Sequence, residues 1–573
     1  MTRKLPFSIP VVSLLLTLPG VALAQTALPG TVPPPVAPTP VAPSPAPYAP
    51  APATMIPPPL LDQPMAPPPM APPPPPVPMA PPAPEPPAPS YAAPAPPSGG
   101  SVHVELTSLR LMRDKGIISQ AEFDSAMHDL ADSAGERAAH EGTIVVGKWA
   151  TTLYGFVEAD SIYDSTRSFN DLAGAAIVQP GNSTAGSNSR WTFGVRNTRL
   201  GFRLKAPEYR GVRASGQLET DFLGTQLPIV TGPYPATVSP SPYGSEGTFF
   251  ASPTLRVRHA YLKIETPVVD ILFGQYWTLF GWGPTYQPNT VEIQGVPGEI
   301  YSRTTQFRVS KTIKVHPVSF DLAVAAMRPV QRDGGLPDGQ AGIKFNVDSW
   351  TGQQTMGPAG TQLSPLSVGV SGLLRHVAVN SFNVASTNTN TTDSTVSSIA
   401  VDGFVPVIPA TKDNRDNALS VQGEFSAGYG DADEFTGLTG GVGFPNPTTG
   451  TYTPDIDPGI VTFDGKGGLH GIQWTTYLFG GQYYLPETNG KVWISGNYSH
   501  SESANSHYYL PISNGKPNGN GVRAAEDWFD VNAFVDPVPG ARLGLEYANF
   551  NDMNVNGIHA INHRIQFSGF FIF

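Results

Sequence analysis

The last thirteen residues of the chain alternate between two kinds of side chain. Odd-numbered positions from Ile561 to Phe573 are mostly apolar, whereas Asn562, Arg564 and Gln566 belong to the other face. A period of two residues predicts a strand with one apolar face. In a soluble sandwich that face meets a protein core, and in a membrane barrel it meets lipid, so the alternation by itself allows both.

The same pattern extends upstream to about residue 148. Segments of roughly ten residues alternate in this way, separated by Gly, Pro, Asn and Asp clusters. Downstream of the N-terminus there is no apolar run of about 18 residues, so a membrane-embedded chain must cross as strands. The chain ends on aromatic Phe573, as does the C-terminal assembly signal that it resembles in outer-membrane barrels. We therefore expect an all-β fold, a transmembrane antiparallel β-barrel over residues 148–573 in the outer membrane of a Gram-negative bacterium.

Fifteen candidate strands can be placed in this region. Single-chain bacterial barrels have an even number of strands, so we expect sixteen, with the missing strand within 381–416 or 445–469. The candidates lie near residues 150–163, 195–206, 211–222, 253–266, 268–279, 303–314, 317–328, 339–349, 364–380, 417–430, 470–485, 490–502, 526–537, 541–551 and 558–573.

The connections between the early strands alternate in length. Short turns near 207–210, 267 and 315–317 are typical of the periplasmic side. The long connections 165–194, 223–252 and 280–302 are typical of extracellular or inward-folded loops.

The N-terminus is typical of a secretory signal. Arg3 and Lys4 precede an apolar run, and residues 21–24 end in a small-x-small cleavage pattern. We expect residues 1–24 to be removed on export, which changes the formal net charge from -11 to -13 because two basic residues are lost. An acidic chain is a poor nucleic-acid binder. Cysteine is absent, which excludes disulfides and suits an oxidising compartment.

Two more segments precede the predicted barrel. Residues 25–100 are dominated by proline and alanine and predict a disordered periplasmic linker, either a plain tail or a spacer that reaches peptidoglycan. Residues 101–140 contain apolar side chains at helical spacing and predict a short helical hairpin of the oligomerisation type, too small to form a core alone. The apolar positions are Leu106, Leu109, Met112, Phe123, Met127 and Leu130.

Parity along each strand indicates which side chains face the lumen, because outward positions must be apolar. In the second candidate strand, for example, Leu200 and Phe202 face lipid. The same parity turns Glu219 and Asp221 inward in the third. It also predicts a basic pore wall that favours anions. Its members are Arg199, Arg203, Lys205, Arg213, Arg256, Arg258 and Arg308.

An alternative meaning of the basic wall is a transverse field in a general diffusion pore. Glu292 and Glu299 of the loop 280–302 would supply the acidic side of that field. Trp277, Phe280 and Trp282 are either members of an aromatic girdle, the commoner role, or residues on which a ligand stacks.

Several sequence fragments resemble the DcaP-like trimeric porins, outer-membrane channels associated with dicarboxylates and other small organic acids. The resemblance covers most of residues 150–573 and is best before 315. The matching fragments are LYGFVEAD from Leu153, GQLETDF from Gly216, LRVRHAY from Leu255, FGQYWT from Phe273, PNTVE from Pro288 and GLEY from Gly544.

The resemblance implies a homotrimer whose 280–302 loop folds inward and narrows the pore. Asn289 stands in that loop where the family pattern leads us to expect an acid, and the Pro/Ala-rich segment is not part of the pattern. The predicted function is passive diffusion of small hydrophilic solutes, favouring anions such as organic dicarboxylates. A general or sugar-permeable porin is one alternative, and a structural tether from outer membrane to cell wall is another.

Motifs for catalysis are not found. The chain has no HExxH metal spacing, P-loop or G-x-S-x-G elbow, and its histidines are scattered. We therefore expect no enzyme activity, no metal and no cofactor.

Overall fold

The computed structural model describes most of the region after residue 142. The described residues are 143–146, 149–173, 177–224, 230–231, 237–238, 253–331, 334–357, 361–380, 391–412, 414–438, 456, 459–464, 468–508, 512–513, 516–517 and 521–573. The predicted signal peptide (1–24), linker (25–100) and helical segment (101–140) lie outside these residues. No helix in the described part is long and apolar enough to cross a membrane.

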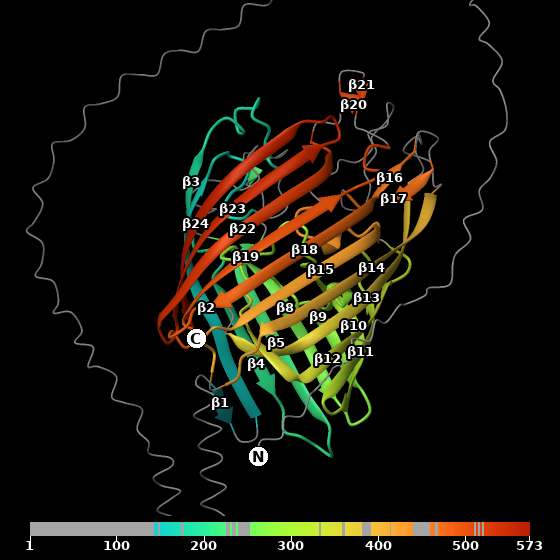
Figure 1. Cartoon of the computed structure of the whole chain (residues 1–573). Helices are drawn as coiled ribbons and strands as arrows, with labels where there is room; N and C mark the ends of the chain where they lie inside the picture. The colour runs from blue at the N-terminus through green and yellow to red at the C-terminus, as the bar shows by residue number, and fades with distance from the viewer. Residues whose placement is uncertain are drawn as a thin grey trace, which may run out of the picture. The chain divides into compact units, whose positions relative to one another are not determined.

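Sixteen of the described strands form one closed antiparallel barrel (Figure 1). Each strand pairs with its neighbours in the barrel, and the last strand pairs with the first, Asp160 opposite Ser568. The barrel strands are β2 (Trp149–Asp164), β4 (Arg199–Lys205), β5 (Arg213–Gly224), β8 (Thr254–Glu265), β9 (Asp270–Trp277), β10 (Arg303–Val315), β11 (Val318–Met327), β12 (Asp338–Gln354), β13 (Gln362–Asn380), β14 (Thr391–Ile408), β15 (Leu419–Tyr429), β18 (Gln473–Tyr484), β19 (Val492–Glu502), β22 (Arg523–Val538), β23 (Ala541–Asn554) and β24 (His559–Ile572).

Shorter elements accompany the barrel. β1 (Thr143–Val146) pairs with the start of β2, and β3 (Arg190–Gly194) pairs with its end. Three small ribbons are β6 (Val230–Thr231) with β7 (Thr237–Val238), β16 (Val461–Phe463) with β17 (Leu469–Gly471), and β20 (Ile512–Ser513) with β21 (Lys516–Pro517). Two 3₁₀ turns, η1 (Phe280–Trp282) and η2 (Ala432–Glu434), lie in connections.

The predicted sixteen-strand barrel is confirmed, and the missing strand is β14. It lies in the first of the two windows proposed for it. The fifteen other candidates each overlap a barrel strand, with ends that differ by a few residues. The candidate 195–206 begins earlier than β4, because residues 195–198 are not in a strand and separate β3 from β4, both of which pair with β2.

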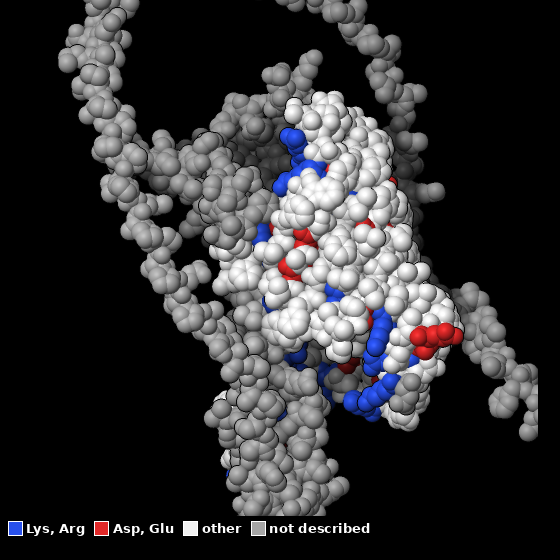
Figure 2. All heavy atoms as spheres, turned by 90° about the vertical axis from the view of Figure 1, so that its left-hand side faces the viewer, with Lys and Arg blue, Asp and Glu red and all other residues white. Residues whose placement is uncertain are grey.

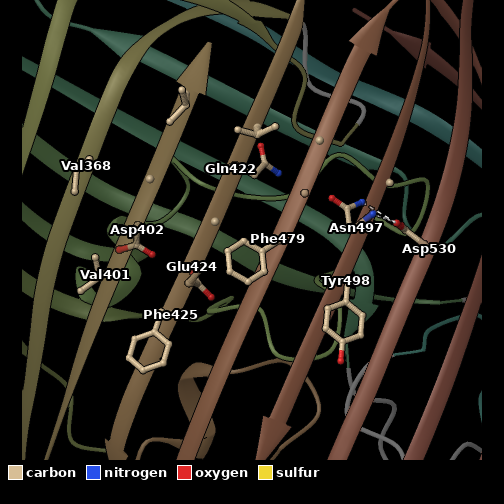
Figure 3. A pocket seen from close by; sticks show the side chains of 17 residues that line it. Val368, Val401, Asp402, Gln422, Glu424, Phe425, Phe479, Asn497, Tyr498 and Asp530 are labelled. Carbon is tan, nitrogen blue, oxygen red and sulfur yellow. Dashed lines mark hydrogen bonds between the residues drawn. The ribbon is translucent and has the colours of Figure 1, made fainter. Parts of the chain in front are cut away.

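The outer face of the barrel is apolar. Figure 2 shows one side, on which uncharged residues cover most of the described surface. Alternation is clear on β14, β15 and β18, where Val401, Phe425 and Phe479 are exposed while Asp402 and Glu424 are buried (Figure 3). The same face carries an apolar hollow of about 840 Å³ on β13–β19. In a membrane this face contacts lipid, and the polar side chains turn to the lumen.

One end of the β12–β13 hairpin turns inward. The carbonyl of Gln353 accepts a hydrogen bond from Ser420 of β15, and Thr355 N–H donates to Gln482 of β18. Farther along, the carbonyl of Gly357 accepts a hydrogen bond from Arg542 of β23 at 3.2 Å. These contacts place the hairpin end across the barrel at the mouth that also holds the short β10–β11 turn, the side predicted to be periplasmic.

Candidate functional site

The connection between β9 and β10, residues 278–302, is almost entirely buried inside the barrel. The first residues of this loop contact strands β12 and β13. The N–H groups of Leu279 and Phe280 both donate to Oε1 of Gln340. The indole of Trp282 packs against glycines of both strands, where an added Cβ would lie 3.0 Å from it at Gly342 and 2.7 Å at Gly369. These glycines make room for the loop inside the barrel.

The middle of the loop is anchored on the opposite wall. The side-chain oxygen of Asn289 accepts a hydrogen bond from the indole N–H of Trp493. Its backbone carbonyl accepts hydrogen bonds from the side chains of Ser495 and Asn497 on β19. The N–H groups of Val291 and Glu292 both donate to one carboxylate oxygen of Glu546 on β23, each at 2.9 Å. The predicted site residue Asn289 therefore holds the loop in place.

The end of the loop returns toward the β8 wall. Gln294 Oε1 accepts hydrogen bonds from Arg256 and Arg258 of β8, at 2.8 and 3.2 Å. Ile300 N–H donates to Glu424 of β15. Because the loop contacts strands on several sides of the barrel, it crosses the lumen and leaves only part of that space open.

A narrow cavity of about 40 Å³ lies between the loop and the barrel wall. It brings together four of the predicted site residues. Arg199 of β4 and Arg258 of β8 come from the wall, whereas Glu292 and Glu299 come from the loop. Trp277 and Tyr301 also line the cavity, with ring centroids 4.7 Å apart. Two guanidinium groups thus face two loop carboxyls across a gap large enough for only a few waters.

Three arginines of the basic wall, Arg199, Arg256 and Arg258, are largely neutralised by two inward carboxylates of β5. Asp221 lies 2.6 Å from Arg256 and 3.1 Å from Arg258. Glu219 lies 2.8 Å from Arg258 and 3.7 Å from Arg199. Three guanidinium groups share two carboxylates, so this cluster retains a net charge of about +1 rather than +3.

A β-bulge concentrates side chains at this cluster. Glu219 pairs with His259 and Thr220 with Val257, which leaves Arg258 as the extra residue of β8. Arg258 and His259 are consequently both buried next to Glu219. Bulges re-aim side chains in this way, and simple parity cannot anticipate them.

The other predicted basic residues differ in their surroundings. Arg203 lies over the ring of Tyr154 at 3.9 Å, and Lys205 is exposed at the end of β4. Arg213 is 64% exposed and lies 3.9 Å from Glu265. Arg308 donates hydrogen bonds to Gln306 and to the carbonyl of Trp277, and it has no acidic partner among the described residues.

The loop carboxyls are held mainly in their protonated form near neutral pH. Burial raises the pKa of Glu292 to about 8, even though the Arg564 guanidinium, 3.1 Å away, favours the charged form and lowers the pKa. Burial likewise raises the pKa of Glu299 to about 8, although the N–H of Val296 donates to its carboxyl. The pKa of Tyr301 is lowered: burial opposes this, but Arg258 and other guanidinium groups outweigh it.

Two features of the site were not predicted from the sequence. Arg303 lies 4.7 Å from the Trp277 ring and 5.0 Å from the Tyr301 ring, although strand parity does not assign it to the lumen. Trp277, Phe280 and Trp282 are all buried, so the girdle role considered for them is wrong. Trp277 ends β9, whereas Phe280 and Trp282 lie within the long loop and its several glycines, and that position is the sequence signal that could have indicated an inward location.

The fold is similar to that of solved outer-membrane channels. The outer membrane channel DcaP of Acinetobacter baumannii matches with a TM-score of 0.51 and 18% identity, over 75% of this chain and 99% of that one. An anion-selective porin from Comamonas acidovorans matches with a TM-score of 0.41 and 10% identity, over 74% and 100%. Neither a family model nor a curated protein sequence matches the chain. The first likeness confirms the predicted porin-type barrel fold.

Proposed function

We propose that this protein is an outer-membrane porin through which small hydrophilic solutes diffuse passively. The supporting observation is the narrow cavity in which Arg199 and Arg258 of the wall face the loop residues Glu292 and Glu299. A lumen narrowed by one inward loop screens solutes by size, while the charges at the narrow point screen them by sign. The process needs no cofactor.

We further propose a moderate preference for anions such as organic carboxylates. The wall cluster contributes only about one net positive charge, because Glu219 and Asp221 neutralise the rest. Arg308 adds a guanidinium with no acidic partner in the described part of the chain. Burial keeps Glu292 and Glu299 largely protonated near pH 7, so the acidic side of the cavity is weak.

The cellular setting follows from the same proposal. The apolar outer face fits the outer membrane. A homotrimer is proposed from the resemblance of the sequence fragments to the trimeric porins. The segment before residue 143 would then lie in the periplasm, where the Pro/Ala-rich part could reach peptidoglycan.

Reversal potentials in a salt gradient across a planar bilayer test the anion preference. We expect Arg308→Gln to lower the anion-to-cation permeability ratio by about fourfold, since one charge at ~10 Å acts on each ion with roughly 0.4 kcal/mol in water-like surroundings, about twofold and in opposite directions for anion and cation. The matched control is the double variant Arg256→Gln/Asp221→Asn, which removes an ion pair without changing net charge. Its ratio should remain close to that of the parent.

The outcomes distinguish the alternatives. A parent ratio near one, unchanged in Arg308→Gln, would support a general diffusion porin and overturn the anion preference. A barrel that inserts without conducting would overturn the channel proposal itself and favour a structural tether.

A further inference from the structure

A second lumenal cavity, of about 220 Å³, lies between the ends of β9–β13 and the 3₁₀ turn η2. It lies at the end of the barrel opposite the β12–β13 hairpin, the end predicted to be extracellular. Its volume holds several water molecules and therefore a small organic solute. The charged residues that line it are Arg303, Arg328, Arg375, Asp338, Asp433 and Glu434.

The basic side of this cavity is formed by Arg303 at the start of β10 and Arg328 directly after β11. The guanidinium of Arg303 lies 4.7 Å from the Trp277 ring and 5.0 Å from the Tyr301 ring, and its Nη1 atom is buried without a hydrogen-bond partner in the described structure. Arg328 is exposed and has no ion pair among the described residues. A buried guanidinium N–H without a partner costs free energy on the order of 1–3 kcal/mol, which an acceptor on a solute would recover.

The acidic side is formed by β12 and η2. Arg375 of β13 contacts all three acids: Nε lies 3.1 Å from Asp338, Nη1 bonds to Asp433, and Nη2 lies 3.5 Å from Glu434. One guanidinium therefore faces three carboxyls. Oδ1 of Asp338 and Oε2 of Glu434 are buried without a hydrogen-bond partner in the described structure.

The surroundings of Glu434 reflect this missing positive charge. Burial, with the neighbouring Asp433 carboxylate, raises the pKa of Glu434 to about 8 in spite of Arg375. An additional cation next to these acids would favour their charged forms.

We infer that this cavity binds a small zwitterion that carries both a carboxylate and an ammonium group, an inference that rests on the proposed channel function. The carboxylate satisfies Arg303 and Arg328, and the ammonium donates to Asp338, Asp433 and Glu434. A dianion of the same length would place its second carboxylate against the acids, and a simple cation would lie against the arginines. Unpartnered donors and unpartnered acceptors around one cavity thus select a solute with both signs of charge.

The test compares four compounds of similar length as blockers of the ion current. Full-length protein in a planar bilayer is exposed, from the side predicted to be extracellular, to 4-aminobutyrate, butyrate, butylamine or glutarate. We expect 4-aminobutyrate to reduce the current at the lowest concentration. Asp433→Asn and Arg328→Gln should each raise that concentration about tenfold, equivalent to roughly 1.4 kcal/mol.

The matched control is Lys314→Gln, which removes a basic residue at the far end of β10, away from the cavity. It should leave the block by 4-aminobutyrate unchanged. A conducting channel on which the four compounds act equally, or on which glutarate acts most strongly, would overturn the zwitterion site while leaving the channel intact. A protein that conducts no current would instead overturn the proposed function.

Discussion

Glu292 and Glu299 are the residues whose ionisation should make the ion selectivity of the proposed pore depend on pH. Both line the narrow cavity, and burial raises the pKa of each to about 8. A carboxyl with a raised pKa is neutral below that value and gains its negative charge as pH rises through it. The cavity should therefore become more negative between about pH 7 and pH 9.

We predict that the anion-to-cation permeability ratio falls as pH rises through this window. The fall should be about fourfold for each carboxyl that ionises, by the same estimate for one charge at ~10 Å. Reversal potentials at pH 6.5 and 9 measure it. Glu299→Gln keeps an oxygen that can accept the N–H of Val296, so it should insert normally and show a smaller fall. Equal falls in parent and variant would exclude Glu299 as a source of the effect.

The sequence correctly predicted which of these side chains face the lumen, but it did not predict which ion pairs they form. Parity turned Glu219 and Asp221 inward together with the arginines, so the pairing that the structure contains was within reach of the sequence. Strand parity could not predict the distances between side chains on neighbouring strands. The bulge at Arg258 shifts the register by one residue, and only the pairing of β5 with β8 reveals it.

The β12–β13 hairpin is the element that most alters the expected shape of the pore, because it narrows one mouth of the barrel. Its inward end hydrogen-bonds to Gln482 and Arg542, and Gln354 donates to the carbonyl of Thr285 in the long loop. Periplasmic turns of such barrels are usually short and leave the mouth open. Here the hairpin and the loop narrow the lumen from both sides.

We predict that shortening this hairpin raises single-channel conductance. Replacing residues 355–361 with a two-residue Asn-Gly turn removes the contacts to β18 and β23 and clears that mouth. Each lost hydrogen bond should cost on the order of 1 kcal/mol, a small fraction of the barrel's stability. An equally substituted β10–β11 turn at residues 316–317 is the control, because in the described structure its backbone bonds beyond its own strands only to Asp348 of the neighbouring β12. An unchanged conductance would mean that the hairpin does not limit flow.

Strands were easier to predict than the segments inside the barrel. Alternation is a local signal, and it located the barrel strands and even the window that contains β14. The loop and the hairpin carry no such signal, because their side chains pack against distant strands. Trp282 illustrates this: its place is set by Gly342 and Gly369, which are remote in sequence.

The whole barrel is closed by residues that follow 148. β2 pairs with β24 over nine residue pairs, and Gly155 exchanges backbone hydrogen bonds with Phe573. The final strand therefore completes the ring and leaves no free edge, as a sheet in lipid requires. Closure within 149–573 implies that the preceding segment is not needed for the barrel itself.

We predict that a chain lacking residues 25–140, with its signal retained, still forms a conducting barrel. Unboiled samples should show the fast electrophoretic mobility of a closed barrel, and single-channel conductance per barrel should equal that of the parent. Binding to purified peptidoglycan measures the other proposed role of the deleted part and should be lost if that part is a tether. Deletion of residues 561–573 is the contrasting variant, because it leaves the edges of β2 and β23 unpaired and should abolish assembly. A truncated chain that assembles but no longer conducts would show that the N-terminal segment takes part in the pore.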